Sequence, residues 1–474
     1  MSNTSPKAPG LVPASVLLAA ERPQWQERLA RFVADFSVDD LGDALKDQTR
    51  LVLLDCIGAM AAGMQEPENT ALAARIARRG TGDVAAIGAG VRLRGDDAAF
   101  VNGVASTALE LDEGNSYARG HPGVHVLPAA LATALANGRS GKDLLSAFVM
   151  GYEVAARIGA ACRLRPSVHP HGTWGTVGAA VATALLEGAG KQEIVTTINV
   201  AATMSVGASL KAMLEGATAR NSYCGLSNRN GMAAWDLVAS GFSGERDCVA
   251  SVYDGILGEG FTGAGMDDDL GNRFEIARNY FKRHAACRFT HAALDVVAGL
   301  VARHDMLAAS DIASIEIETY AMAAQLDAPR PHNVLAARFS LPFAVATTLV
   351  NGKAAVEAFR EPHLSDETIL SLADRVTLRE DPELTALLPA KRPARVTIRL
   401  TDGSELAGET FTNRGDAVDP FTPQEVREKF ADLASPVWGA AHAARVLAAV
   451  DDLDKAADLK GFNCLLAEPA IKDR

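Results

Sequence analysis

Apolar residues follow a helical period through the first half of the chain. In residues 37–63 they recur on one helical face at Leu41, Leu45, Val52, Cys56 and Ala59, which is the spacing of an amphipathic helix. Ser37 with Asp40 and Ser140 with Asp143 form capping-box patterns, which mark helix starts. The pattern predicts a long series of helices over residues 20–265.

These predicted helices are rich in alanine and glycine, as in residues 175–190 and 191–210. Small residues on several faces let helix axes approach closely, so the pattern predicts a compact bundle with inner helices surrounded by others. No fixed period of about 20 to 50 residues repeats along the chain, which argues against a solenoid.

The pattern changes to short alternation after about Gly265. Residues 314–320, SIEIETY, alternate as a strand does, and residues 394–411 form two alternating runs joined across Asp402-Gly403, a strong hairpin signal. Helical segments at 290–305 and 332–352 accompany these strands. The mixture predicts a smaller α+β unit.

Helical sequence returns at Thr422, which has Pro423 and Glu425 in the positions of a capping box. The predicted fold is mainly α, a large all-helical domain with an inserted smaller α+β lid domain. Its expected parts are a helical domain at 1–265 with an N-terminal arm at about 1–20, the lid domain at 266–415, and a helical C-terminal segment at 416–474 that packs on the first domain.

Composition narrows the function classes. The 474 residues carry a formal net charge of -12, which argues against sequence-independent binding to nucleic acid. The six cysteines are scattered without a CxxC pair, which favours a reducing compartment. The N-terminal apolar run lacks a basic flank and is too short to span a bilayer. We expect a cytoplasmic protein without a membrane partner.

Four loops concentrate ionisable side chains. They carry Glu110, Asp112, Glu113, Arg119, His121 and His125; then Arg163, Arg165, His169 and His171; then Arg220, Tyr223 and Arg229; and finally Lys282, Arg283, His284, Arg288 and His291. A single histidine near a helix start is more often a cap or a satisfied buried group. Four such loops in an acidic chain favour a site for an anion.

Five blocks carry a family resemblance: AAFVNGVASTALELDEGNSYARGHPGVHVLPAALA, HPHGTWGTVGAA, KRHAACRFTHAALD, ARFSLPFAVATTLVNG and VTIRLTDGSELAGE. Together they resemble the MmgE/PrpD family, which includes 2-methylcitrate dehydratase, cis-aconitate decarboxylase and an iminodisuccinate epimerase. The likeness runs from about residue 25 to about residue 455. It implies a helical domain with an α+β lid, a homodimer, a small polycarboxylate substrate, and neither a metal nor an organic cofactor.

The resemblance also implies roles for single residues. His121, His169 and Lys282 match the family's active-site histidines and lysine, and His291 matches a histidine of the same block as Lys282. The remaining expected substrate-binding residues are Glu110, Asp112, His171, Arg220, Tyr223 and Arg288.

Several positions depart from the family pattern. Glu110 replaces a leading aspartate, and Gly114 stands where decarboxylases have a hydroxyl. Arg220 and Tyr223 stand in place of a lysine and a histidine, and His171 replaces a small residue. These departures bear on the substrate more than on the reaction class.

The residue types suit the family chemistry. Removing a proton next to a carboxylate adds negative charge to it, which fixed cations and hydrogen-bond donors in a dry cleft stabilise. Imidazoles can take or give that proton near neutral pH. The sequence leaves open whether dehydration, decarboxylation or epimerisation follows, and which residue is the acid and which the base.

Two other functions stay open. One is a metal-dependent hydrolase that uses the histidine pairs His121/His125 and His169/His171, although Pro122 and Gly123 interrupt the helical face that such a pair needs and no HExxH motif occurs. The other is a catalytically silent ligand-binding member of the same family.

Overall fold

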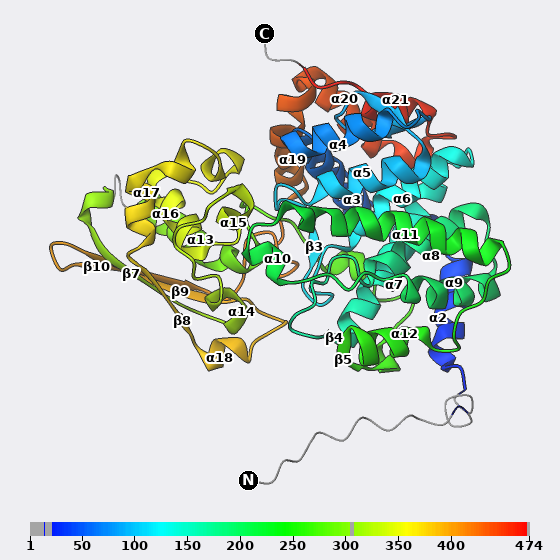
Figure 1. Ribbon diagram of the computed structural model, residues 1–474, viewed down its shortest axis with the longest axis horizontal. Coiled ribbons are helices and arrows are strands. Elements are labelled where there is room, and N and C mark those ends of the chain that lie inside the picture. Colours follow the sequence, from blue (N-terminus) through cyan, green and yellow to red (C-terminus); the bar gives the residue numbers. More distant parts are fainter. Residues whose placement is uncertain (1–13, 15–20, 304–307, 472–474) are drawn as a thin grey trace.

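The computed structural model describes residues 14, 21–303 and 308–471. The expected N-terminal arm at about 1–20 therefore lies outside the described residues, apart from Ala14. Figure 1 shows a large helical body and, to one side of it, a smaller part with a sheet. The prediction of a mainly α fold with a smaller α+β domain is confirmed.

Helices build the body in two stretches of the chain. The first stretch contains α2 (Gln24–Asp35), α3 (Asp43–Gly63), α4 (Pro67–Ala77), α5 (Gly95–Ser106), α6 (Pro122–Ala136), α7 (Gly141–Ala161), α8 (Gly175–Glu187), α9 (Lys191–Thr203), α10 (Lys211–Leu214), α11 (Ser222–Ala239) and α12 (Cys248–Ala250). The second contains α19 (Pro423–Trp438), α20 (Ala440–Asp451) and α21 (Lys460–Leu466).

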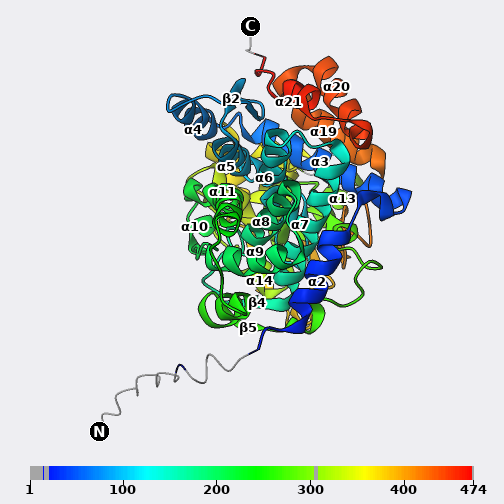
Figure 2. The ribbon, with the colours of Figure 1, turned by 90° about the vertical axis from the view of Figure 1, so that its right-hand side faces the viewer.

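Helix α8 lies at the centre of the bundle, with α6, α7, α9 and α11 around it (Figure 2). Small residues make the close approach possible. A Cβ added at Gly178 of α8 would lie 2.5 Å from the carbonyl oxygen of Gly151 on α7 and 2.7 Å from Cβ of Ala155. The predicted inner helix of a compact bundle is thus present, and it rests on glycine at the contact.

The purely helical prediction for residues 20–265 is wrong at three short strand pairs. These are β1 (Val84–Ala86) with β2 (Val91–Leu93), β3 (Gly114–Asn115) with β6 (Asn279–Tyr280), and β4 (Cys162–Leu164) with β5 (Gly258–Phe261). Strands of two to four residues are too short to show alternation, and in two of the pairs the partner is far away in the sequence.

Capping boxes form where the sequence places them, with one difference. The boxes at Ser140 and Thr422 begin α7 and α19. The box at Ser37 begins a 3-10 turn, Val38–Asp40, and α3 begins only at Asp43. A capping box satisfies the first amides of any helical turn, so it marks a start without fixing the length that follows.

The α+β part is built on one sheet in the order β10 (Glu405–Thr410), β9 (Ala394–Leu400), β7 (Ile312–Thr319) and β8 (Val376–Glu380). Strands β9 and β10 form the predicted hairpin, in whose turn Gly403 has a φ of 88°. Strand β7 matches the predicted strand at 314–320 within two residues. Strand β8, parallel to β7, was not predicted.

One face of this sheet is apolar and the other is charged. Ile315, Ile317, Val396 and Ile398 are buried in one cluster with residues of α13 (His291–Arg303) and α16 (Leu341–Asn351). The remaining helices of this part are α14 (Ala321–Ala324), α15 (Val334–Arg338), α17 (Glu367–Ala373) and α18 (Pro382–Thr385).

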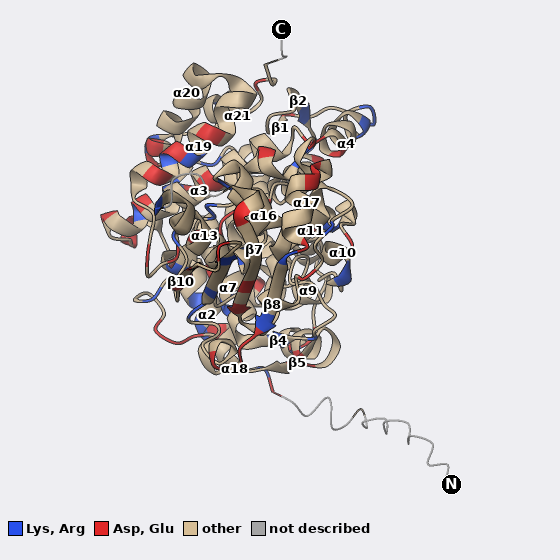
Figure 3. Cartoon of the chain, turned by 90° about the vertical axis from the view of Figure 1, so that its left-hand side faces the viewer, with Lys and Arg blue, Asp and Glu red and all other residues tan. Residues whose placement is uncertain are grey.

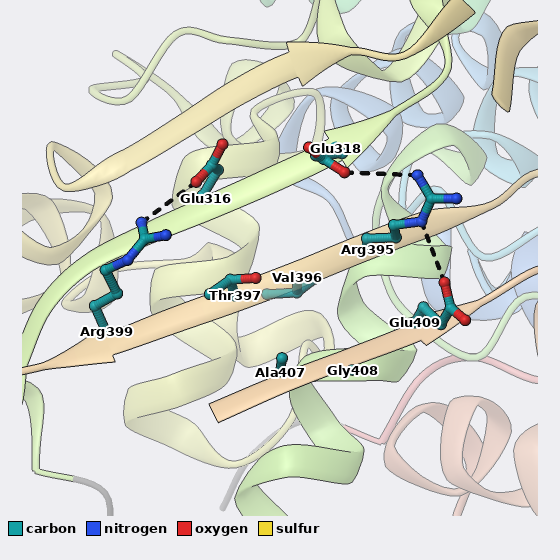
Figure 4. Close-up of a pocket in the computed structure, with 9 residues that line it drawn as sticks. All are labelled: Glu316, Glu318, Arg395, Val396, Thr397, Arg399, Ala407, Gly408 and Glu409. Atoms are coloured by element: carbon teal, nitrogen blue, oxygen red, sulfur yellow. Dashed lines mark hydrogen bonds and ion pairs between the residues drawn. The ribbon is translucent and has the colours of Figure 1, made fainter. Parts of the chain in front are cut away.

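Ion pairs cross the strands on the other face, which Figure 4 shows. Arg395 Nη1 lies 3.6 Å from Glu318 Oε2 and Arg395 Nε lies 3.2 Å from Glu409 Oε2. Arg399 Nη1 lies 3.3 Å from Glu316 Oε2. These pairs are half-exposed, so they add little to stability, and we assign no function to this face.

The C-terminal helices return to the body, as the sequence predicts. Helix α19 packs on α3, where Phe430 would contact a Cβ placed at Gly58 at 3.1 Å. Figure 3 shows acidic and basic residues together along α19, without a surface of one sign there. Among the described helices, α7 is long and apolar enough to cross a membrane, but 83% of its apolar window is buried in the bundle, as in an ordinary core helix.

Candidate active site

A cavity of about 470 Å³ lies where the body meets the α+β part. Residues from both parts line it, and six of them are arginines: Arg119, Arg163, Arg165, Arg220, Arg288 and Arg392. Three imidazoles, those of His121, His169 and His171, also line it. Glu110 is the one carboxylate in the lining. The cavity is therefore strongly cationic although the whole chain is acidic.

A buried charge cluster lies at the inner end of this cavity. Lys282 Nζ is 3.1 Å from Glu110 Oε2 and 3.3 Å from Asp112 Oδ1. Arg220 Nη1 is 2.6 Å from Glu110 Oε1. All four side chains are at most 3% exposed, so two cations and two anions neutralise one another away from water.

Local backbone geometry brings the carboxylates to Lys282. Glu110 has a φ of 55°, in the left-handed region that side chains other than glycine rarely adopt. This turn follows α5 closely and redirects the chain. Strand β3, directly after it, pairs with β6 through Gly114 and Tyr280. Because Lys282 follows β6 by two residues, this short pairing holds the acidic loop beside the lysine.

His121 points its Nδ1 into the protein. Nδ1 lies 2.6 Å from the carbonyl oxygen of Glu113 and 3.0 Å from Asp112 Oδ2. A carbonyl oxygen only accepts, so Nδ1 carries the hydrogen and Nε2 keeps its lone pair. An acceptor on Nδ1 and a free Nε2 is the arrangement of an oriented general base.

His121 occupies the N-cap position of α6, but its side chain caps nothing. The carboxyl group of Glu113 takes that role, because its Oε1 accepts the amide hydrogen of Gly123 at 2.7 Å. A Cβ on Gly123 would lie 2.7 Å from the same oxygen. The interpretation of His121 as a simple helix cap is therefore excluded.

Burial and neighbouring charges set the protonation states. Burial opposes ionisation, but Arg220 and Lys282 lower the pKa of Glu110, and His121 and Lys282 lower that of Asp112. Burial likewise disfavours the charge of Lys282, but Asp112 and Glu110 hold its pKa above its ordinary value. Burial lowers the pKa of His121. The cluster is thus ionised beside a neutral imidazole at neutral pH.

Glu113 behaves differently from its two acidic neighbours. Burial raises its pKa to about 8, so its carboxyl group stays largely protonated at pH 7. Its Oε2 accepts a hydrogen bond from the hydroxyl of Tyr152 at 3.1 Å. The neutral carboxyl group of Glu113 thus accepts two hydrogen bonds beneath the loop. It is suited to holding α6 and the Glu113 carbonyl in place rather than to proton transfer.

The second histidine loop places two different imidazoles at the cavity. His169 Nδ1 accepts the backbone amide hydrogen of His171 at 3.0 Å, and Arg220 Nε lies 3.3 Å from His169 Nε2. Two donors facing one ring disfavour an imidazolium, and burial followed by Arg220 lowers the pKa of His169. His169 is thus engaged at both nitrogens.

The predicted site residues fall into three groups. Those in the cavity wall are Glu110, His121, His169, His171, Arg220 and Arg288. Asp112 and Lys282 lie behind this wall, joined to it by the charge cluster. Tyr223 and His291 are outside the lining: Tyr223 packs on the ring of His169, and His291 lies beside Arg288, with Nδ1 3.2 Å from its Nη1.

Tyr280 and Arg392 are among the lining residues that were not predicted. Tyr280 lies opposite Gly114, where an added Cβ would come within 2.4 Å of its hydroxyl oxygen, so a side chain at 114 would displace it. Arg392 bonds the hydroxyl and the carbonyl of Ser116 across the two parts. In the sequence, the only signal for Tyr280 is its position two residues before Lys282, in NYFK, and no local signal marks Arg392.

The cationic lining is only partly neutralised. Arg220 and Arg288 pair with Glu110 and Asp416, whereas the hydrogen bonds of Arg119 and Arg392 go to carbonyl and hydroxyl oxygens. Donors held by neutral acceptors keep their positive charge available for an anion. In the described part of the chain, no group of three or more His, Cys, Asp or Glu side chains has a geometry that could hold a metal ion.

Comparison with known proteins identifies the family of this chain. The family model for the MmgE/PrpD N-terminal domain matches residues 27–264, and that for the MmgE/PrpD C-terminal domain matches residues 284–455. The chain belongs to the MmgE/PrpD family. The two matched ranges contain every residue of the charge cluster except Lys282, which lies between them.

Several curated relatives align along nearly the whole chain. The cis-aconitate decarboxylase-like protein oryM of Aspergillus oryzae is 25% identical, over 93% of this chain and 96% of its own length. The cis-aconitate decarboxylase of Aspergillus terreus is 23% identical, over 94% and 96%. That of Homo sapiens is 25% identical, over 94% and 95%.

Proposed function

We propose that this protein is a lyase that handles a proton on a carbon next to a carboxylate group of a small di- or tricarboxylate. The observation that supports this best is His121 in the wall of a cavity lined by arginines. Its Nδ1 donates to the Glu113 carbonyl and lies 3.0 Å from Asp112 Oδ2, while Nε2 has no hydrogen-bond partner among the described residues. An oriented base and a cationic wall are the two features that such a reaction needs.

The cations of the wall bind the substrate in this proposal. A small polycarboxylate enters with two or three negative charges, and Arg119, Arg288 and Arg392 offer donors to them. The cavity of about 470 Å³ is large enough for such a molecule and is lined by both parts of the protein. A substrate that displaces water from it would strengthen each of these charge contacts.

Lys282 acts through the carboxylates in this proposal. It is fully buried and touches Glu110 and Asp112 rather than the cavity. Lys282 helps to keep Asp112 ionised, and this carboxylate stabilises the imidazolium that forms when His121 accepts a proton, whereas the charge of Lys282 itself lowers the pKa of the ring. Lys282 is thus a positioning residue, whereas His121 is the proposed catalytic residue.

Decarboxylation is the reaction that we test first, because the relatives carry that activity in their names. Loss of carbon dioxide leaves an electron pair on carbon. His121, after taking up a proton from solvent at Nε2, would transfer that proton to the carbon and return to the neutral ring. The experiment incubates the protein with cis-aconitate and with a panel of other di- and tricarboxylates, and follows them by NMR. Formation of a product from one of them supports the proposal. Purified, folded protein that leaves the whole panel unchanged contradicts it.

A further inference from the structure

Two imidazoles beside the cavity each bury a nitrogen without a hydrogen-bond partner among the described residues. These atoms are Nε2 of His125 and Nδ1 of His171. The centroids of the two rings are 4.8 Å apart, and the ring planes meet at 85°. Buried polar side-chain atoms are normally paired, so two unpaired nitrogens on adjacent rings call for a common explanation.

The hydrogen on His125 is on the other nitrogen. Its Nδ1 lies 2.7 Å from the carbonyl oxygen of His121, which can only accept. Burial lowers the pKa of His125 to about 4, so the ring is neutral at pH 7. Nε2 of His125 is therefore a buried acceptor that lacks a donor.

Packing keeps His125 in this orientation. A Cβ added at Gly175 would lie 2.5 Å from Cδ2 of His125, and the ring of Trp174 has its centroid 5.7 Å away. The ring thus fills a space that exists because residue 175 is glycine. It cannot turn Nε2 toward another partner without disturbing the start of α8.

The ring of His171 lies next to this acceptor, with the two ring centroids 4.8 Å apart. It lines the cavity, and neither of its ring nitrogens bonds to a residue in the described part of the chain. This distinguishes it from His169, whose two nitrogens both face donors. A hydrogen on Nδ1 of His171 would satisfy His125 Nε2, directly or through one water, and would leave Nε2 of His171 as a free base.

We propose that His171 is a second acid–base residue of the site, and that His125 is the positioning residue that fixes its tautomer. The proposal rests on the proposed function. It gives His171 the same arrangement as His121, in which an inner acceptor holds Nδ1–H and Nε2 is free. The two rings are 5.0 Å apart and edge to face, so both can reach one small substrate.

His171 alone can both take the proton from the substrate and return it. Nε2 takes a proton from a substrate carbon, and the electron pair of the C–H bond stays on the anion that the adjacent carboxylate stabilises. The imidazolium keeps its hydrogen on Nδ1, and return of the proton from Nε2 to carbon restores the neutral ring. Burial, followed by Arg220, His169, His125 and His121, lowers the pKa of His171, which favours the neutral base in the resting site.

The first test determines the tautomer of His171 in the absence of substrate. Protein labelled with ¹⁵N-histidine gives tautomer-dependent nitrogen shifts, and the His171→Asn variant assigns the His171 signals among ten histidines. We expect hydrogen on Nδ1 of His171 in the native protein and a shift toward the Nε2–H form in His125→Phe. An Nε2–H tautomer in the native protein, or no change in His125→Phe, overturns the positioning role.

His442→Phe is the matched control. His442 is also buried and packs on a tryptophan, with its centroid 5.6 Å from that of Trp438, but it is outside the cavity lining. This variant should leave the His171 signals unchanged. A change equal to that in His125→Phe would show that the shift reports general loosening of the core, and would overturn the assignment.

The second test reads proton transfer in deuterium oxide with the polycarboxylate panel. His171→Asn and His125→Phe should each lower the rate of deuterium incorporation at least about 10-fold, because a lost acid–base group typically costs more than that. Incorporation at the native rate in His171→Asn overturns this inference and leaves the proposed function standing. Native protein that exchanges no proton on any compound contradicts the proposed function itself, and the acid–base role of His171 falls with it.

Discussion

Replacing Lys282 by methionine tests how the charge cluster supports the site. Methionine keeps most of the volume of the side chain and removes its charge. In the native cluster the ammonium lies 3.1 Å from one carboxylate and 3.3 Å from another. After the substitution Glu110 still has Arg220 at 2.6 Å, whereas Asp112 loses its ammonium partner and keeps the His121 ring, with Nδ1 3.0 Å from its Oδ2.

The expected loss of stability follows from these distances. Each contact is worth about 5 kcal/mol at an effective dielectric constant of about 20, and burying the ions costs several kcal/mol for each of them. Removing one partner of a buried pair typically costs about 3 to 5 kcal/mol. We expect Lys282→Met to lose about that much free energy of unfolding in urea, and Lys282→Met with Asp112→Asn to recover a large part of it.

The Lys282→Met substitution should also change activity, because it alters the pKa of His121. Lys282 lowers the pKa of His121, while Asp112 raises it. Without the lysine the pKa of the ring rises, so the base is protonated up to a higher pH. The acidic limb of the pH profile of kcat/KM should therefore move to higher pH, and kcat/KM at neutral pH should fall. An acidic limb that stays in place, or moves to lower pH, in a variant that is still folded would refute this reasoning.

Two further substitutions, Glu113→Gln and Lys429→Met, test how buried side chains hold the acidic loop in place. Burial raises the pKa of Glu113 from 4.5 to about 8, so the stability that its proton gives is complete below about pH 4.5 and lost as the pH rises through 8. Native protein should thus lose stability relative to Glu113→Gln over this range in urea titrations, and a constant difference would contradict the shift. Lys429 Nζ lies 2.6 Å from Asp55 Oδ1 and donates to the Leu111 carbonyl at 2.7 Å. Lys429→Met should cost about 3 to 5 kcal/mol, most of it recovered when Asp55→Asn is added; a single variant as stable as the native protein would contradict this.

Local signals explain which parts of the fold could be predicted. The hairpin at Asp402-Gly403 and the boxes at Ser140 and Thr422 depend on neighbouring residues only, and they form as expected. Strand β8 lies parallel to β7, and a parallel partner must be distant in the sequence. Its pairing leaves no local mark, which is why it was missed.

The site residues likewise divide into those with a local signal in the sequence and those without one. The loop at 110–125 carries its polar residues together, so its importance is visible in the sequence. Strands β3 and β6 pair although about 165 residues separate them in the sequence. This pairing places Lys282 beside two carboxylates and Tyr280 in the space next to Gly114. The exclusion of Tyr223 from the cavity lining has the same tertiary origin. The homodimer and the cytoplasmic location stay predictions.

Deuterium incorporation at carbon tests the central claim most directly. Native protein, His121→Gln and the control His332→Gln, whose ring is exposed, are incubated in deuterium oxide with cis-aconitate and the other polycarboxylates, and carbon-bound hydrogen is followed by NMR. We expect the native protein and the control to place deuterium on a carbon next to a carboxylate, in substrate or product, and His121→Gln to do so at least about 100-fold more slowly with an unchanged melting temperature. Incorporation at the native rate in His121→Gln would contradict the account.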